Sequence, residues 1–211
     1  KTFIALYKAL EEVLDKSNWI VLSVTPKIGK KILKKLKFKK NHTILNFMST
    51  IHNSELKKMI FPANQIFKIA PLPMIKYNLG PIVIFPKNKI IENFFNKLGK
   101  VIATNDEKEN KKLWVMTSFM ATYLEIFNTA HKWFVKKGIN PNRSKEYINH
   151  LFRALNNELL KNTNYSLDTM IKEFQTKGGI NADLLSRTKK SGIFKNLDKG
   201  FNKIYNRIKK S

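Results

Sequence analysis

Cysteine is absent from the 211 residues, which excludes a disulfide framework and a thiolate metal site. This absence is typical of a reducing compartment, and we predict a cytoplasmic location. No apolar run approaches the roughly 20 residues that cross a bilayer. The four histidines lack the spacing of metal ligands, so we expect no metal. The sequence does not begin with methionine and has no signal-peptide pattern, which favours a piece of a longer chain.

Acidic residues are scarce as well, because 15 Asp and Glu stand against 40 Lys and Arg, for a formal net charge of +25. Such a surplus favours partners that carry phosphate, such as nucleic acids, anionic membranes or dinucleotides. The lysines, however, are spread along the chain, arginine is rare, and no RNA-binding motif occurs. An AT-rich coding sequence also produces this abundance of Lys, Asn, Ile and Phe. We therefore expect general surface charge, with neither a nucleic-acid partner nor a membrane.

Up to about residue 104, short apolar runs alternate with stretches of helical periodicity, which is typical of an α/β domain with a parallel sheet. Strands are expected at residues 19–24, 43–47, 66–70, 82–85 and 101–104. Helices are expected at residues 3–15, 28–36, 54–59 and 89–98, with Ser54 as the N-cap of the third and Gly99 as the cap of the fourth.

The second half of the chain reads as all-helical. The polar segment 105–110 is interpreted as a linker or as the exposed start of the next helix, and no strand is expected after Lys111. A long helix at 113–137 is apolar on most sides, which indicates burial in a domain centre or an oligomer interface. Gly138 caps it, and further helices are expected at about 143–161, 166–175, 182–190 and 194–209.

A pair of glycines, Gly178 and Gly179, separates two of these helical patterns. Glycine lets the backbone turn sharply and come close to a ligand. The residues after the pair restart a helix at once, so unpaired N–H groups face the turn and suit a carboxylate. An ordinary turn between helices is the alternative interpretation, in which Asn181 serves as an N-cap alone.

Several segments resemble, in order and spacing, motifs of the pyrroline-5-carboxylate reductase family. Ser23-Val24-Thr25-Pro26 is similar to the Ala-Val-Lys-Pro run that ends the family's fourth strand, and Asn46-Phe47-Met48-Ser49-Thr50 stands where the family has Ser-Ile-Ala-Ala-Gly. The run from Lys68 to Pro73 resembles Arg-x-Met-Pro-Asn-Thr, and the run from Thr117 to Tyr123 resembles Ser-Gly-Ser-Gly-Pro-Ala-Tyr. The segment from Thr176 to Asn181 resembles the family's Gly-Gly-Thr-Thr turn, with Ile180 and Asn181 in place of the threonines.

The resemblance covers essentially the whole chain and implies two domains. Residues 1–105 correspond to a partial NAD(P)-binding Rossmann-type domain, and residues 106–211 to an all-helical dimerisation and substrate domain. It implies a homodimer, NADP or NAD as the cofactor, and the reduction of a small cyclic imine carboxylate, as in proline biosynthesis. The implied cofactor-binding residues are Ser23, Val24, Thr25, Pro26, Asn46, Met48 and Ser49. The implied substrate-binding residues are Ser118, Met120, Gly178, Gly179, Ile180 and Asn181.

The family's Gly-x-Gly-x-x-Gly turn, which holds the pyrophosphate, does not occur in these 211 residues. We expect that about 60 residues precede Lys1 in the full protein, by comparison with the family pattern. A non-catalytic relative that has lost cofactor binding, and acts as a structural or basic binding protein, is the alternative. Leu72 in place of the family's asparagine and Thr25 in place of its lysine support either this alternative or a changed substrate. No residue is assigned a catalytic role.

Overall fold

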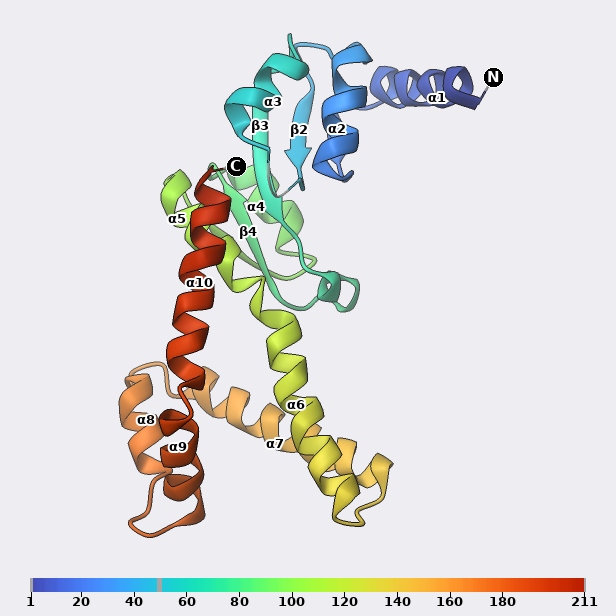
Figure 1. The fold of residues 1–211 in the computed structure, drawn as a ribbon. Coiled ribbons are helices and arrows are strands. Elements are labelled where there is room, and N and C mark those ends of the chain that lie inside the picture. The colour runs from blue at the N-terminus through green and yellow to red at the C-terminus, as the bar shows by residue number, and fades with distance from the viewer. Residues whose placement is uncertain (1, 49–50, 211) are drawn as a thin grey trace. The chain divides into compact units, whose positions relative to one another are not determined.

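The computed structural model describes residues 2–48 and 51–210, with side chains from residues 7–48 and 51–209 (Figure 1). The chain divides into two compact units. The first comprises Lys1–Thr117 together with Lys203–Ser211, and the second comprises Ser118–Asn202. Each unit is described by itself below.

The first unit is built on a five-stranded sheet with the order β1-β2-β3-β4-β5. The strands are β1 (Trp19–Leu22), β2 (Thr43–Asn46), β3 (Gln65–Ala70), β4 (Pro81–Phe85) and β5 (Lys100–Ala103). Their positions agree with the five predicted strands, although β1 ends two residues earlier than expected. In the parts of the chain that the structure describes, no strand follows β5, so the predicted order of an α/β region and then a helical region is confirmed.

One pairing differs from the predicted parallel sheet. β1, β2 and β3 are mutually parallel and so are β4 and β5, but β3 and β4 pair antiparallel. The reason lies in the connection. Only the short 3-10 turn η2 (Pro73–Tyr77) separates β3 from β4, whereas a parallel return needs a crossover of a dozen or more residues. Prolines around η2 prevent a longer helix there, and the chain turns back beside the strand it has just left.

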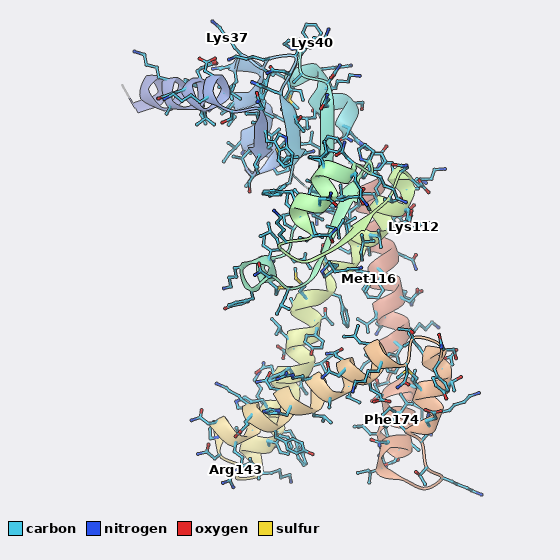
Figure 2. All side chains as sticks on the ribbon, turned by 180° about the vertical axis from the view of Figure 1, so that it is seen from behind. Lys37, Lys40, Lys112, Met116, Arg143 and Phe174 are labelled. Atoms are coloured by element: carbon cyan, nitrogen blue, oxygen red, sulfur yellow. The ribbon has the colours of Figure 1, made fainter. Side chains whose placement is uncertain are left out.

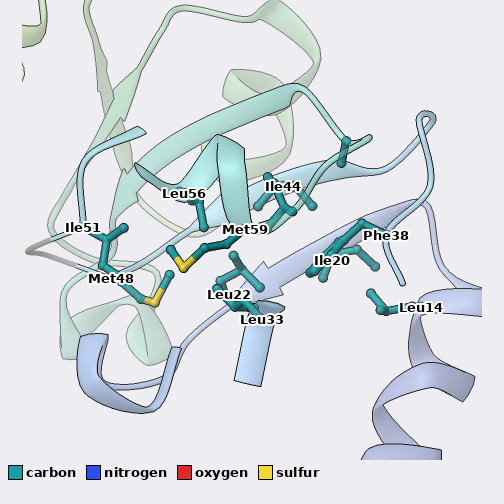
Figure 3. Packing of buried hydrophobic residues seen from close by; sticks show 12 residues of the cluster. Leu14, Ile20, Leu22, Leu33, Phe38, Ile44, Met48, Ile51, Leu56 and Met59 are labelled. Atoms are coloured by element: carbon teal, nitrogen blue, oxygen red, sulfur yellow. The ribbon is translucent and has the colours of Figure 1, made fainter. Parts of the chain in front are cut away.

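Both faces of the sheet are covered by apolar clusters, because successive strand residues point to opposite sides. On one face, Ile20, Leu22 and Ile44 pack under α2 (Pro26–Ile32), the turn η1 (Leu33–Lys35) and α3 (Asn53–Met59), and Leu14 of α1 (Thr2–Lys16) joins them (Figure 3). On the other face, Leu45, Phe67 and Ile69 pack against α4 (Lys89–Phe95). A third cluster joins β3 and β4 to α5 (Glu107–Met116) through Trp114.

Several helix boundaries correct the sequence-based predictions. The expected single helix 113–137 is two helices, α5 and α6 (Phe119–Lys136), interrupted at Thr117, whose hydroxyl donates to the carbonyl of Trp114 (2.8 Å). The segment 105–110 is mostly the start of α5, with Asp106 as its N-cap. Ser54 does not cap α3, which begins one residue earlier. α4 ends at Phe95, so Gly99 is not its cap.

The second unit is helical throughout its described residues. It contains α6, α7 (Pro141–Lys161), α8 (Leu167–Glu173), α9 (Ile180–Lys190) and the first part of α10 (Ile193–Lys210). α6 and α7 pack together through the rings of Tyr123, Phe127 and Phe152, and His131 Nδ1 lies 2.9 Å from the Ser144 hydroxyl. Gly138 has the positive φ of a helix-ending glycine (+84°), as predicted.

Candidate functional site

The first candidate region is the edge of the sheet where β1 and β2 end. Leu22 and Asn46 are register partners in a parallel pair, so the segments that follow them leave the sheet at the same edge. This brings together the predicted cofactor residues 23–26 and 46–48. Ser49 lies outside the described residues. In open α/β sheets, ligands bind at the carboxyl ends of the strands, and this edge has the location required for one end of a dinucleotide.

The residues at this edge differ in how far their side chains are exposed to solvent. Ser23, Val24 and Thr25 are exposed, and Pro26 begins α2 at the first helical position, which proline favours. Asn46 is fully buried, and its Oδ1 accepts a hydrogen bond from the Met48 N–H (3.0 Å), which fixes the turn after β2. Residues 23–25 are therefore accessible at this edge, whereas Asn46 is buried and holds the turn after β2.

Met48 is also buried, and its packing explains a glycine in α2. A Cβ atom added to Gly29 would lie 2.7 Å from the Met48 sulfur. The absence of a side chain at Gly29 therefore lets α2 approach the turn after β2 closely. The side chain of Met48 therefore serves the core, and the residue is not exposed to a ligand in this structure.

A buried polar group lies beside this edge on β3. Lys68 is the register partner of Asn46, is only 6% exposed, and its Nζ lies 5.1 Å from the ring centre of Trp114. The pKa of Lys68 is lowered from 10.5 to about 8, first by burial and next by the charge of Lys111, against the opposing effect of Glu107. Burial has this effect because it disfavours the charged form of the amine.

Further buried polar atoms lie on α5 and β2, the elements that contact or pair with β3 at Lys68. Within the described residues, the amide atoms of Asn110, the Nδ2 of Asn46 and the Nε1 of Trp114 have no hydrogen-bond partner. Glu107, Asn110 and Trp114 follow helical spacing, so they lie on one stripe of α5. None of these three residues was predicted from the sequence as a site residue. A lysine inside the apolar run Ile66-Phe67-Lys68-Ile69-Ala70 was the available signal.

The second candidate region is the Gly178-Gly179 turn in the helical unit. Gly178 adopts a left-handed backbone (φ +76°), and the Gly179 N–H donates to the carbonyl of Thr176 (2.8 Å). Gly179 is the N-cap residue of α9 and has no side chain to cap it. Ile180, which follows, is 88% exposed. The sharp turn expected from the sequence is therefore present, and it leads directly into a helix.

The start of α9 differs from the starts of the two preceding helices. The Asn140 side chain caps α7 by accepting from the N–H groups of Asn142 and Arg143, and Ser166 caps α8 by accepting from the Thr169 N–H. No side chain of the described residues caps α9 in this way. The N–H groups of its first turn remain available to an external acceptor, and the helix dipole favours an anion there.

Ser118 and Met120 are placed at the start of α6. Ser118 is exposed at its N-cap position and forms no side-chain cap, and Met120 is partly exposed. Figure 1 draws the start of α6 and the loop before α9 at opposite ends of the helical unit. Within one chain, the structure therefore does not join Ser118 and Met120 to the Gly178–Asn181 turn.

The described residues contain neither a metal-binding cluster nor a membrane-spanning helix. No group of three or more His, Asp or Glu side chains there is arranged to hold a metal ion. No described helix is long and apolar enough to cross a membrane.

Comparison by sequence and by structure gives different results. No protein-family model matches the chain, and no curated protein matches it by sequence. Solved structures of pyrroline-5-carboxylate reductases do match. The enzyme from Streptococcus pyogenes has a TM-score of 0.86 and 17% identity, over 100% of this chain and 85% of its own. The enzyme from Plasmodium falciparum, solved with NADP bound, has a TM-score of 0.84 and 17% identity, over 94% of this chain and 79% of its own. The enzyme from Coxiella burnetii has a TM-score of 0.72 and 14% identity, over 94% of this chain and 77% of its own.

These likenesses extend over both units of the chain, at identities that carry information about the fold alone. The resemblance inferred from the sequence motifs is confirmed at that level. The chain has the fold of the pyrroline-5-carboxylate reductases, a Rossmann-type sheet followed by a helical domain.

Proposed function

We propose that this protein is an NAD(P)H-dependent reductase of a small cyclic imine carboxylate, similar to pyrroline-5-carboxylate reductase and acting in proline biosynthesis or a related reaction. The observation that carries the proposal is the likeness to the Streptococcus pyogenes enzyme over the whole chain. NADP is the first candidate cofactor, since the Plasmodium falciparum structure contains it, and NAD is the second.

The proposed roles follow from the two regions. The edge formed by residues 23–26 and 46–48 would hold the nicotinamide, with the exposed Ser23–Thr25 segment against the ring. The uncapped start of α9, at Gly178–Asn181, would accept the substrate carboxylate through backbone N–H groups. Ser118 and Met120 would also contact the substrate. Because they lie away from the α9 turn in one chain, this arrangement draws the turn from a second subunit.

The chemistry requires little from the protein beyond positioning. The reduced nicotinamide, when bound, supplies a hydride to the imine carbon. The chain holds the carboxylate at the start of α9, which fixes the distance between the imine carbon and the ring. A positive helix end also lowers the cost of bringing an anion into the site.

Dimerisation is part of the proposal. The second unit exposes 19 of the 30 large hydrophobic side chains that are exposed in the described chain, although it is the smaller unit. Apolar surface of this extent is typical of an interface. We expect light scattering to give the mass of a homodimer at micromolar concentration, and a stable monomer would contradict the shared site.

The alternative is a non-catalytic relative with the same fold. It is favoured by the replacements at Thr25, Leu72, Ile180 and Asn181. Titration of the protein with NADPH, followed by nicotinamide fluorescence, separates the two. Binding together with imine-dependent oxidation of NADPH supports the reductase, and the absence of both supports the non-catalytic relative.

The carboxylate site is tested by Asn181→Asp. A negative charge at the second residue of α9 would repel the substrate carboxylate, and a like charge about 5 Å away is worth roughly 3 kcal/mol near a protein surface. We expect KM to rise about 10- to 100-fold, with dinucleotide binding unchanged. The fold should tolerate the change, since an acidic residue is favourable at a helix start. Substituting Gly179 is less suitable, because its Cβ would lie 3.0 Å from the Thr176 carbonyl oxygen.

Asn142→Asp is the matched control. Asn142 holds the same position in α7, whose first turn is already capped by Asn140. The control should leave KM unchanged. An equal rise of KM in both variants would indicate a general charge effect, and no rise in either would remove the carboxylate site from the proposal.

A further inference from the structure

The positive charge of this protein is unevenly distributed. The first unit has 26 Lys and Arg against 8 Asp and Glu, a net of +18, whereas the second has 14 against 7, a net of +7. Within the first unit, residues 16–54 contain nine lysines and no acidic residue.

The fold collects these lysines on one structure. Lys27, Lys31 and Lys34 follow the helical spacing i, i+4, i+7 along α2 and η1, so they share one stripe, and all three are exposed. Lys37 and Lys40 continue from η1 in the connection to β2, and Figure 2 labels both at the same end of the first unit. We name these five residues the basic ridge.

Acidic neighbours neutralise other lysines of the segment. Lys30 pairs with Glu55 (2.8 Å) and Lys39 with Asp15 (2.8 Å). In the part of the chain that the structure describes, no carboxylate forms an ion pair with Lys27, Lys34 or Lys40. Lys37 lies nearer to acidic groups, since the Glu11 carboxylate accepts from its backbone N–H (3.0 Å) and, after Lys39, its charge helps to lower the pKa of Asp15. Like charges at this spacing destabilise a helix slightly, and an anionic partner would relieve that repulsion.

An aromatic ring lies beside the ridge. The Nζ of Lys35, between Lys34 and Lys37 in the sequence, lies 5.7 Å from the ring centre of Tyr7, which is partly exposed on α1. Lysines that follow a phosphate backbone, combined with an aromatic ring on which a base can stack, are the elements of single-strand binding.

A membrane surface fits this ridge less well. A helix that lies on a bilayer needs an apolar face free to enter it. The apolar side of α2 and η1 is already used, since Gly29 and Leu33 are buried against the sheet, and Leu33 and Ile32 belong to the core cluster beneath it. Ile28 is the one large apolar side chain that α2 and η1 expose, so the surface offers charge and one ring but no continuous apolar face to insert.

We propose that the basic ridge binds single-stranded nucleic acid through its phosphates, with Tyr7 as a stacking platform. This proposal differs from the expectation from composition that the charge has no nucleic-acid partner. The binding is independent of base sequence, because lysine contacts phosphate as a point charge. It is a second activity, separate from the proposed reductase and testable without it.

The test uses the whole protein and a labelled single-stranded RNA of mixed sequence, followed by fluorescence anisotropy at several salt concentrations. Five phosphate contacts predict a slope of log K against log salt near −3.5, or about a 100-fold loss of affinity between roughly 50 and 200 mM salt. Replacing Lys27, Lys34, Lys37 and Lys40 by Gln should weaken binding at least tenfold and reduce the slope by about 3.

The control removes the same charge elsewhere. Replacing Lys132, Lys136, Lys145 and Lys195 by Gln, all exposed in the second unit, also lowers the net charge from +25 to +21. The control should bind nearly as the parent does, and Tyr7→Leu should weaken binding several-fold at unchanged salt slope. Equal loss in both lysine variants would show bulk charge only and overturn the proposal. The absence of RNA binding at about 50 mM salt would also overturn the proposal. Binding to anionic phosphatidylserine vesicles but not to RNA would overturn it as well.

Discussion

Replacing Lys68 by Met should stabilise the protein at neutral pH and change how its stability depends on pH. The amine is buried on the central strand β3, where Met can occupy the space of the aliphatic stem with little change in volume. The pKa of Lys68 falls from 10.5 to about 8 in the folded protein because burial disfavours its charge. The substitution removes that cost.

The size of the effect follows from the two pKa values. The difference of 2.5 units between 10.5 and about 8 corresponds to roughly 3 kcal/mol, at about 1.4 kcal/mol per unit. Below pH 8 both the folded and the unfolded wild-type chains hold the proton, and the whole cost is present. Between about pH 8 and 10.5 the unfolded chain binds more protons, so the stability of the wild type rises with pH. Where the amine is charged, below about pH 8, the variant also loses the cation–π contact with Trp114, which lowers its free energy of unfolding by about 1 kcal/mol.

We therefore expect Lys68→Met to be about 2 kcal/mol more stable than the wild type near pH 7. Near pH 10.5 the two proteins should be nearly equal in stability, because the buried amine is then neutral, carries no burial cost and makes no cation–π contact. Urea unfolding of both proteins between pH 7 and 10.5 gives the difference in their free energies of unfolding. The other ionisable groups are the same in both proteins, so their contributions cancel in this difference. Lys112→Met is the matched control for the loss of one lysine, because Lys112 is exposed on α5, the helix whose Trp114 lies against Lys68 (Figure 2). A constant difference for Lys68→Met would refute the reasoning.

Three stability predictions concern single positions, each measured by thermal or urea unfolding. Gly200→Ala in α10 should stabilise by about 1 kcal/mol, since nothing lies within 4 Å of the added Cβ and alanine favours the helix; a loss would contradict this. Gly99→Ala should destabilise by about 1–3 kcal/mol, because its Cβ would lie 2.7 Å from the Gly80 carbonyl oxygen; an unchanged midpoint would show that the backbone shifts freely. Asn88→Ala should cost about 1 kcal/mol, since Asn88 caps α4 by accepting from Ile90 and Ile91; Asn93→Ala, on the same helix, is its control.

The order of elements could be predicted from the sequence because it depends on local patterns. Apolar runs of four to six residues mark the five strands, and helical spacing marks the helices around them. The Gly178-Gly179 turn was predictable for the same reason, since a left-handed residue before a helix favours glycine. Even the break between sheet and helices was visible as a change of periodicity. Each of these features needs only neighbours in the chain.

Contacts between distant segments create the remaining features. The burial of Trp114 beside Ala70 and Val83 arises only when α5 packs against β3 and β4. The low pKa of Lys68 arises because α5, some 40 positions later in the sequence, covers it. Distant segments create these environments by contact, and a residue's own neighbours in the sequence carry no record of them. Local patterns set where strands, helices and turns form, including the short connection that turns β4 back, whereas three-dimensional contact set the chemistry of the buried lysine.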